Sequence, residues 1–342
     1  MATSVARALG LGGGALLVLF LAACAGPGAE PEAIQAASAG AELMERADKL
    51  FGGRKYAEAR GLYARASQAG GSSSVFVQAC ARVARCESIL GQPLEGRPWL
   101  ALAQARARAE EPLGWSRVQQ VLGIYEREEG QGQAASRRFE ALFEYCLEHE
   151  LFSRAIDAAH HVVLATADFD EQLAWSRKGI AAAEQGGLQG WLAVLWNNLG
   201  ASLEDRGRFA DALMAYEEAR RYHDLVGDDR AQLVADWAVG HAQRLLGQLT
   251  AARATLEAAH TWALARQAAE PGPKNAEWVG YTLWDLAEID WLEGASERAL
   301  VRLKSARLSL LEARIETWGE FGQRELARLD QHLAEWSAGD KP

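Results

Sequence analysis

The residues best suited to acid–base or metal chemistry lie closest together in the stretch from 149 to 161. His160 and His161 are adjacent, Asp157 lies one turn before His161, and His149 is a little upstream. Adjacent residues on a helix point about 100° apart, so only one of the two histidines can share a face with Asp157. One imidazole and one carboxylate on a helix are typical of solvated surface residues. We therefore expect this group to be neither a metal site nor an acid–base pair.

Other signatures of catalysis are absent from the sequence. It contains no Gly-x-Ser-x-Gly, no His-Glu-x-x-His, no phosphate-binding loop and no dinucleotide fingerprint after a strand. Asp168 and Asp170 are explained by a loop or by the start of a helix. The sequence therefore predicts a protein that is not an enzyme and that holds no cofactor and no metal.

The cysteines favour buried thiols over a disulfide framework. Beyond Cys24, which is treated below, three remain, an odd number that cannot pair completely within one chain. Cys80 and Cys86 are separated so that a helix would point them to different sides, which disfavours a bridge between them. We expect small buried side chains, and a disulfide that involves Cys146 is the alternative.

The charge balance argues against nucleic acid as a partner. Lys and Arg number 36 against 46 Asp and Glu, which gives a formal net charge of −10. A surface of this kind repels a phosphate backbone, and no polybasic patch is present that would hold an anionic lipid surface. We interpret the acidic balance as a contribution to solubility.

The rest of the chain copies one segment, residues 196–219, which predicts two short helices. Trp196, Leu199, Gly200 and Leu203 fall at i, i+3, i+4 and i+7 and form one apolar stripe. Gly207 then ends the first helix. The segment therefore begins with an amphipathic helix of standard length.

The second half of this segment carries a matching stripe. Ala212, Tyr216 and Ala219 repeat the helical spacing, and a tight turn joins the two helices. Two helices joined in this way can close face to face only if small residues lie where they touch. Gly200 and Ala212 are those small residues.

The same pattern recurs along the chain. The copies are Val239, Gly240, Gly247, Ala252, Leu256 and Ala259; Leu283, Leu286, Ala287, Gly294, Ala299, Leu303 and Ala306; Leu122, Gly123, Gly130, Ala135 and Phe139; Tyr56, Ala59, Tyr63 and Ala66; and, more loosely, Gly91, Gly96, Leu100 and Ala103. The weakest copy lies between about 153 and 185, where no Leu-Gly pair is present. A hairpin cannot bury both of its faces alone, so recurrence is what makes the pattern credible.

The repeating unit resembles the tetratricopeptide repeat (TPR). The family pattern of Trp, Leu-Gly, an aromatic residue or Leu, then Ala and an aromatic residue is met in the central copy, although Asp224 stands near the place of the usual closing Pro. The resemblance implies an all-α, right-handed superhelical solenoid of about seven TPR-like hairpins. Residues 318–337 would form a capping helix, with Phe321, Leu326, Leu329 and Leu333 on its inner side.

The resemblance also implies a concave groove that binds a protein or an extended peptide. In this family the first helix of each hairpin lines that groove. Carried over residue by residue, the expected partner-binding positions are Asn197, Asn198, Ala201 and Glu204; Trp237, Ala238, His241 and Arg244; and Tyr281, Trp284, Asp285, Glu288 and Trp291. The alternative is that Trp237 and Trp284 pack between helices, a common fate of aromatic residues at helical spacing.

Two positions depart from the repeat pattern. Gln243 and Asp290 stand where the central copy has Leu203. If these two helices are slightly rotated, Ala242 and Ile289 take the inward place, and the groove positions shift by one residue.

The first residues predict a secretion signal. Residues 1–23 hold one charge, Arg7, followed by an apolar run rich in Leu, Ala and Gly that is too short to span a bilayer comfortably. This run ends in Leu21, Ala22, Ala23 and Cys24, which resembles the lipobox of bacterial lipoproteins. The resemblance implies that Cys24 is acylated and becomes the new N-terminus, a plain cleaved signal or an uncleaved anchor being the alternatives. Ala25 at the next position would direct the protein to the outer membrane.

The domain boundaries follow from composition. Residues 24–40 carry two Pro, three Gly and no aromatic residue, which predicts a flexible tether after the acylated Cys24. Residues 41–338 are Ala-rich and favour helix, which predicts the solenoid. We expect a lipid-anchored, non-catalytic scaffold or adaptor that faces the periplasm. The alternative is a structural subunit of a larger envelope secretion or assembly complex.

Overall fold

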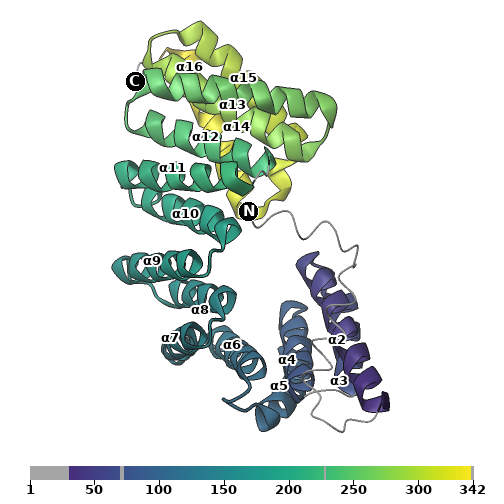
Figure 1. Cartoon of the computed structure of the whole chain (residues 1–342). Coiled ribbons are helices and arrows are strands. Elements are labelled where there is room, and N and C mark those ends of the chain that lie inside the picture. The colour runs from purple at the N-terminus through teal and green to yellow at the C-terminus, as the bar shows by residue number, and fades with distance from the viewer. Residues whose placement is uncertain (1–30, 70–72, 227–228, 340–342) are drawn as a thin grey trace, which may run out of the picture. The chain divides into compact units, whose positions relative to one another are not determined.

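The computed structural model describes residues 31–69, 73–226 and 229–339 and, within them, only helices, turns and bends (Figure 1). The predicted leader 1–23, Cys24 and the first part of the tether lie outside the described residues. Within the described ranges the chain is all-α, as the repeat pattern predicts. It divides into two compact units, with the boundary in the sequence between Ala182 and Ala183, and each is described by itself.

The first unit is built from consecutive helices joined by short turns. They are α2 (Pro31–Gly52), α3 (Tyr56–Gln68), α4 (Ser73–Ile89), α5 (Pro93–Arg106), α6 (Pro112–Glu128), α7 (Gly132–Glu148), α8 (Phe152–Ala165) and most of α9 (Phe169–Gln185). Within it, α2, α4 and α6 each pack against the following helix, and α8 packs against α7. Helix α2 begins at Pro31 and so takes in ten residues of the predicted tether, because Pro is tolerated in the first turn and the Ala-rich residues after it favour helix.

The second unit repeats the arrangement and ends in a single helix. Its helices are α10 (Gln189–Glu204), α11 (Phe209–Val226), α12 (Asp229–Leu245), α13 (Leu249–Ala269), α14 (Pro273–Leu292), α15 (Ser296–Glu312), a short 3-10 turn (Ile315–Thr317) and α16 (Gly319–Ala338). The pairs α10–α11, α12–α13 and α14–α15 pack as hairpins. Counted in chain order, with α8 and α9 as one pair, the described residues contain seven consecutive helix pairs and a final helix.

The turns inside five of the seven helix pairs confirm that a glycine ends the first helix there. Gly91, Gly130, Gly207, Gly247 and Gly294 have φ angles of 77°, 79°, 70°, 74° and 81°. This left-handed conformation costs a residue with a Cβ atom about 1 to 2 kcal/mol, whereas glycine adopts it freely. In these five pairs the glycine therefore fixes where the first helix ends and the second begins.

The Leu-Gly positions confirm the predicted close contact between paired helices. A Cβ atom added at Gly200 would lie 2.5 Å from Cε1 of Tyr216, and one at Gly240 would lie 2.6 Å from Cγ of Leu256. The equivalent atom at Gly123 would lie 2.6 Å from Cζ of Phe139. Only glycine leaves room for the large side chain of the second helix at this point.

The last helix covers the end of the second unit. Leu329 and Trp336 are buried in a cluster with Trp284, Leu303 and Leu310, and Leu326 and Leu333 pack against that cluster. Phe321 differs from the expectation for a capping helix, because 48% of its surface is exposed. It lies at the start of α16, one turn before the part of the helix that meets the core.

The three cysteines that the structure describes confirm the prediction of buried thiols. Cys80, Cys86 and Cys146 are free and fully buried. Burial raises the pKa of the Cys80 and Cys86 thiols to about 11 and that of Cys146 to about 12. They pack as small apolar side chains. None of the described helices combines the length and the apolar composition that crossing a bilayer requires.

The close contact at Gly200 gives the first test of the fold. Gly200→Ala should destabilise the protein by about 1 to 3 kcal/mol, because the added methyl group collides with the ring of Tyr216. The measurement is urea denaturation followed by circular dichroism.

Gly190→Ala is the matched control, because Gly190 lies on the same helix with open space around it. Replacing a helical glycine by alanine there should leave stability unchanged or raise it by up to about 1 kcal/mol. Equal destabilisation by both changes would contradict the proposed helix register.

Candidate functional site

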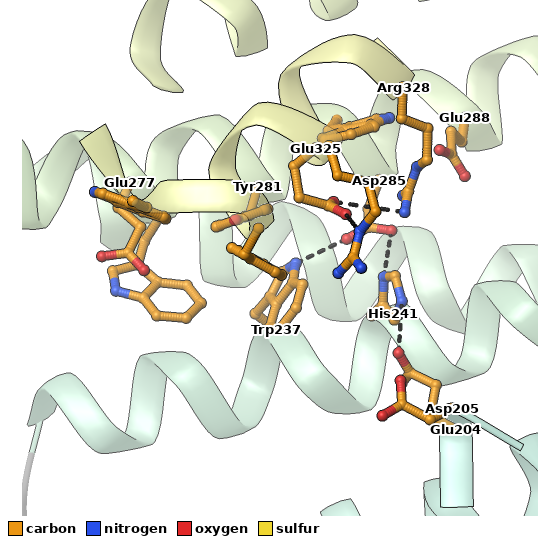
Figure 2. A pocket seen from close by; sticks show the side chains of 15 residues that line it. Glu204, Asp205, Trp237, His241, Glu277, Tyr281, Asp285, Glu288, Glu325 and Arg328 are labelled. Carbon is orange, nitrogen blue, oxygen red and sulfur yellow. Dashed lines mark hydrogen bonds and ion pairs between the residues drawn. The ribbon is translucent and has the colours of Figure 1, made fainter. Parts of the chain in front are cut away.

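The second unit contains a cavity of about 500 Å³. First helices of the hairpins, as the groove prediction requires, and the final helix α16 line this cavity (Figure 2). Helix α10 and the turn after it contribute Glu204 and Asp205, α12 contributes Trp237 and His241, and Trp318 precedes α16. The remaining lining residues are Glu277, Trp278, Tyr281, Trp284, Asp285 and Glu288 from α14 and Phe321, Arg324, Glu325 and Arg328 from α16.

The floor of the cavity is organised around the buried carboxylate of Asp285. Trp237 donates its indole N–H to Oδ2 of Asp285 at 2.7 Å. Oδ1 accepts a hydrogen bond from Nε of Arg244 at 2.6 Å and lies 2.7 Å from Nδ1 of His241. All three donors come from α12, on the positions i, i+4 and i+7 of one helix face. Asp285 on α14 therefore contacts three side chains on one face of α12.

The network extends in two directions from this aspartate. Nε2 of His241 lies 3.3 Å from Oε1 of Glu204, whose other oxygen accepts the hydroxyl hydrogen of Tyr216 at 3.0 Å. Figure 2 shows His241 between the two carboxylates. On the other side, the guanidinium of Arg244 also contacts Glu288. The first helices of three successive hairpins are thus joined through side-chain charges.

Burial and neighbouring charges shift the pKa values of His241 and Asp285 in opposite directions, and the effect of the charges is the larger. Burial alone would lower the pKa of His241, but Asp285 and Glu204 outweigh it and raise the pKa to about 9. Burial would likewise raise the pKa of Asp285, but His241 and Arg244 hold it well below its ordinary value. At neutral pH His241 and Asp285 are therefore both ionised, and Arg244 is the second cation beside Asp285.

Aromatic rings form the walls of the cavity. Trp237 lies 5.5 Å from the rings of both Trp278 and Tyr281, measured between ring centroids. The guanidinium of Arg328 lies 4.5 Å over the ring of Trp284. Rings and a stacked guanidinium give broad contact area with few rotatable bonds, which suits recognition of another chain.

The structure brings together most of the residues that the sequence predicts for the groove. Glu204, Trp237, His241, Tyr281 and Trp284 line the cavity, and Arg244 lies directly behind Asp285 and borders an adjoining hollow. Whether a tryptophan lines the groove or packs between helices has a different answer for Trp237 and for Trp284. Trp237 is half-buried in the wall, whereas Trp284 belongs mainly to the core, with 3% of its surface exposed.

Three predicted positions lie elsewhere. Asn197 is half-buried and Asn198 is exposed, and neither lines the cavity, because the cavity lies near the C-terminal end of α10. Trp291 is a correction, because it packs in the core, where its ring stacks on Trp336 with centroids 4.8 Å apart. The final helix covers the end of α14 and removes Trp291 from any groove.

Sequence reasoning missed the contribution of α16 and of the first turns of α14. The predicted capping helix carries aromatic and basic residues at every third or fourth position: Trp318, Phe321, Arg324 and Arg328. This spacing indicates a second face on the helix, polar and aromatic, and could have revealed the contribution of α16. Trp278 and Glu277 lie one turn before Tyr281. Ala242 and Ile289 are fully buried, as the predicted rotation of the two departing helices requires, but Asp290 is fully buried as well, so burial does not establish a rotation of α14.

The histidine pair in the first unit differs from its prediction in one respect. His161 is buried rather than solvated, and its ring stacks on Phe139 at 4.7 Å. Burial lowers its pKa to about 4. Asp168 behaves as expected, since its Oδ1 accepts the backbone N–H of Glu171 at the start of α9. Across the described residues, His, Cys, Asp and Glu side chains form no group that could hold a metal ion.

Comparisons with known proteins identify the fold. No family model matches the sequence, and no curated protein matches it. The chain is similar to the crystal structure of a signal transduction ATPase with numerous domains that has a tetratricopeptide repeat sensor, from Pyrococcus horikoshii. The TM-score is 0.65 and the identity 13%, over 85% of this chain and 44% of that one. This chain therefore spans less than half the length of that protein.

A second solved structure matches over its full length. It is the C-terminal part of a TPR repeat-containing protein from Cytophaga hutchinsonii, with a TM-score of 0.53 and 13% identity, over 87% of this chain and 100% of that one. At these identities the likeness concerns the fold. The chain therefore has a TPR-like fold.

The charge of His241 predicts a pH dependence of stability. Its pKa in the folded protein, about 9, lies above the ordinary value of 6.5, so the stability it contributes is fully present below about pH 6.5. That contribution should be lost as the pH rises through about 9. A gap of this size corresponds to about 3 kcal/mol. Urea denaturation followed by tryptophan fluorescence between pH 6 and 10 measures it.

His241→Gln should remove the alkaline loss of stability, because a neutral amide does not titrate. His160→Gln is the control, since His160 is exposed in the first unit. A His241→Gln variant that loses stability over the same pH range as the unchanged protein would show that another group titrates.

Proposed function

We propose that this chain is a non-catalytic scaffold of the bacterial cell envelope, held on a membrane by an acylated Cys24, that binds a protein partner in the cavity of its second unit. The partner presents an extended peptide segment. The observation that carries the proposal is the cavity built by the first helices α12 and α14 and by α16, with rigid aromatic walls and an ion-paired floor.

The size and lining of the cavity suit a peptide with a large side chain. Its volume of about 500 Å³ falls within the usual range for ligand sites, about 300 to 1,000 Å³. Trp237 and Tyr281 are half-buried and supply apolar contact area, and Phe321 is half-exposed at the same cavity. Aromatic residues of this kind commonly dominate binding energy at interfaces between proteins.

The charges at the two ends of the cavity favour a partner segment with basic side chains. Asp285 and Glu204 are already matched by His241 and Arg244. Glu277 and Asp205 lie at opposite ends of the site in Figure 2, and burial raises the pKa of Glu277. The nearest cation to Glu277 is Arg230, at 3.8 Å. A Lys or Arg of the partner would stabilise either carboxylate.

The membrane tether rests on the sequence. An apolar run ending in Leu21, Ala22, Ala23 and Cys24 supports acylation of the cysteine and removal of the leader. More than one acyl chain gives durable anchoring, whereas a single chain binds a membrane only reversibly. We propose the outer membrane, with the helical units in the periplasm.

The tether predicts the behaviour of a cysteine variant. Cys24→Ser should abolish labelling with a palmitate analogue and leave the unprocessed precursor, because the serine hydroxyl cannot replace the thiol that receives the lipid. Labelling and mass spectrometry of the N-terminus in a Gram-negative host measure both. Cys146→Ser is the control, since Cys146 is buried and should not be acylated. Labelling that persists in Cys24→Ser would disprove the anchor.

A second candidate function is a structural subunit of an envelope secretion or assembly complex. It is favoured by large apolar side chains exposed on the second helices of the hairpins. Met214 on α11 and Val301 and Leu308 on α15 each have 65% to 67% of their surface exposed. A permanent partner would bury such residues against itself.

Photocrosslinking from two positions separates the two functions. A photoreactive phenylalanine analogue at Phe321, beside the cavity, should capture the partner of the adaptor in the intact envelope. The same analogue at Leu308, on the outer face of α15, should capture nothing if the chain is an adaptor, because a partner in the cavity lies out of its reach.

The pattern of crosslinks decides between the candidates. A partner captured from Phe321 whose crosslinked peptide carries Lys or Arg supports the adaptor. A product from Leu308 in fixed stoichiometry, with none from Phe321, would favour the structural subunit. Phe321→Ala should weaken partner binding by roughly tenfold or more, with little loss of stability, because half of this side chain is already exposed.

A further inference from the structure

The cavity of the second unit follows one face of α14 over about three turns. Glu277, Tyr281, Asp285 and Glu288 all line it, and their spacing of four, four and three residues places them on the same side of the helix. At a rise of 1.5 Å per residue, Glu277 and Asp285 lie about 12 Å apart along the helix axis, and Glu277 and Glu288 about 16 Å apart. The cavity is therefore long enough for several residues of an extended chain.

Glu277 stands at one end of the cavity with a weak counterion. Its side chain is 22% exposed, and burial raises the pKa of its carboxyl group. The cation beside it, Arg230, is 3.8 Å away and keeps 42% of its own side chain exposed. An ion pair that is this open to water contributes little to stability. A cation inside the cavity would compensate the carboxylate of Glu277 better.

Asp205 stands at the other end, where the polarity of a helix also favours a cation (Figure 2). It is the C-cap residue of α10, and the partial charge at a helix C-terminus is negative. The neighbouring Glu204 is matched by His241 at 3.3 Å. Asp205 is exposed, and among the described residues no Lys, Arg or His lies within 4.0 Å of its carboxylate. The end of α10 is thus a second place for a positive charge.

Aromatic rings occupy the stretch between these two ends. The rings of Trp237, Trp278 and Tyr281 lie within 5.5 to 6.0 Å of one another, measured between centroids. Tyr281 follows Glu277 by one turn, and the indole of Trp237 is hydrogen-bonded to Asp285 one turn further on. A large apolar side chain is therefore the best occupant of the middle of the cavity.

The cations that α16 brings to the cavity are engaged elsewhere. Arg324 and Arg328 lie 3.9 Å and 3.5 Å from the carboxylate of Glu325, and Arg328 also stacks over the ring of Trp284. They do not reach Glu277 or Asp205 within ion-pair distance. The two ends of the cavity consequently keep their negative charge.

We propose that the cavity recognises an extended segment with a basic residue at position i, a large apolar residue at i+2 and a second basic residue at i+4. This motif rests on the proposed function, since it specifies the peptide that the cavity binds. Side chains at i, i+2 and i+4 of an extended chain point to the same side, so all three can enter the cavity together.

The length of the motif follows from the geometry of α14. Four residues of an extended chain cover about 13 Å. His241 lies between Glu204 and Asp285, at 3.3 Å and 2.7 Å, so the end of α10 lies at the level of Asp285. The two carboxylate ends are therefore about 12 Å apart along α14, which matches a spacing of four residues. The order basic, apolar, basic is the same in both chain directions.

Three capped peptides test the motif. They are acetyl-Lys-Ala-Trp-Ala-Lys-amide, the rearranged acetyl-Lys-Lys-Trp-Ala-Ala-amide and the neutral acetyl-Gln-Ala-Trp-Ala-Gln-amide. Isothermal titration calorimetry with the full chain at physiological salt measures their affinities. The first peptide should bind about thirtyfold more tightly than the neutral one, because it gains both ion pairs. The rearranged peptide has the same charge but reaches only one end, so it should bind at least threefold more weakly than the first.

Two variants assign the ends of the cavity. Glu277→Gln should weaken binding of the first peptide by about tenfold, and Asp205→Asn by about threefold, because Asp205 is more exposed to water. Neither change should alter the affinity of the neutral peptide, whereas a structural defect would weaken both peptides alike. Glu297→Gln is the matched control, since Glu297 is an exposed carboxylate on α15 outside the cavity.

The remaining outcomes separate the motif from the proposed function. Equal affinity for the first and the rearranged peptide would overturn the motif and leave peptide binding in the cavity intact. An equal loss of affinity in Glu297→Gln would assign the binding to general attraction by an acidic protein and would also overturn it. If none of the three peptides binds, the motif is wrong, and crosslinking from Phe321 decides separately whether the cavity takes a different segment.

Discussion

The close approach of two helices at a glycine is the contact on which each standard hairpin depends. At Gly123, Gly200 and Gly240 the first helix comes so near to its partner that a Cβ atom would overlap a ring or a branched side chain. The large residue of the second helix fills the space that the glycine leaves. This contact sets the rotation of the first helix about its own axis, and with it the residues that face away from the partner helix.

Rotation of the first helices explains why charged residues meet in the second unit. With the glycine face of α12 turned toward α13, the positions of Trp237, His241 and Arg244 turn toward α14. Asp285 on α14 then meets all three. A buried carboxylate is costly unless it is paired and hydrogen-bonded. Asp285 faces two cations, His241 and Arg244, so loss of either would weaken its charge compensation. The floor of the cavity is therefore held by contacts between α12 and α14.

The sequence was sufficient to predict the fold and much of the site, because both depend on local spacing. The Leu-Gly pairs, the glycines of the turns and the face that contains Trp237 and Tyr281 all follow from helical periodicity. The weak copy between about 153 and 185 lacks a Leu-Gly pair, and the boundary between the two units falls inside that range, in α9. A repeat without its closest contact has less to hold it to its neighbours.

Contacts between distant segments could not be predicted in the same way. Trp291 shares the spacing of Trp284, yet α16 covers it and stacks Trp336 on its ring. The burial of His161 depends on Phe139, a residue of another hairpin pair. The contribution of Arg328 depends on how the final helix crosses α14. In each case the outcome is decided by packing between elements, which a pattern within one repeat does not contain.

Charge matching shows how the fold tolerates buried ions. Asp290 occupies the place of a core leucine and is fully buried, but Arg253, Arg298 and Arg302 surround it at 2.7 to 2.8 Å. Its burial is compensated within the protein, so it needs no ligand, and it joins α14 to its neighbours on the side opposite to Asp285.

The same criterion gives the opposite result for Arg117 and Arg154. They lie on first helices, as Arg244 does, but the partners that they have found are an amide, a hydroxyl and a carbonyl. Neutral acceptors satisfy the geometry of a guanidinium and leave its charge in place. Arg244, which is buried, is paired with two carboxylates, whereas Arg117 and Arg154 are half-buried and keep part of their surface in contact with water.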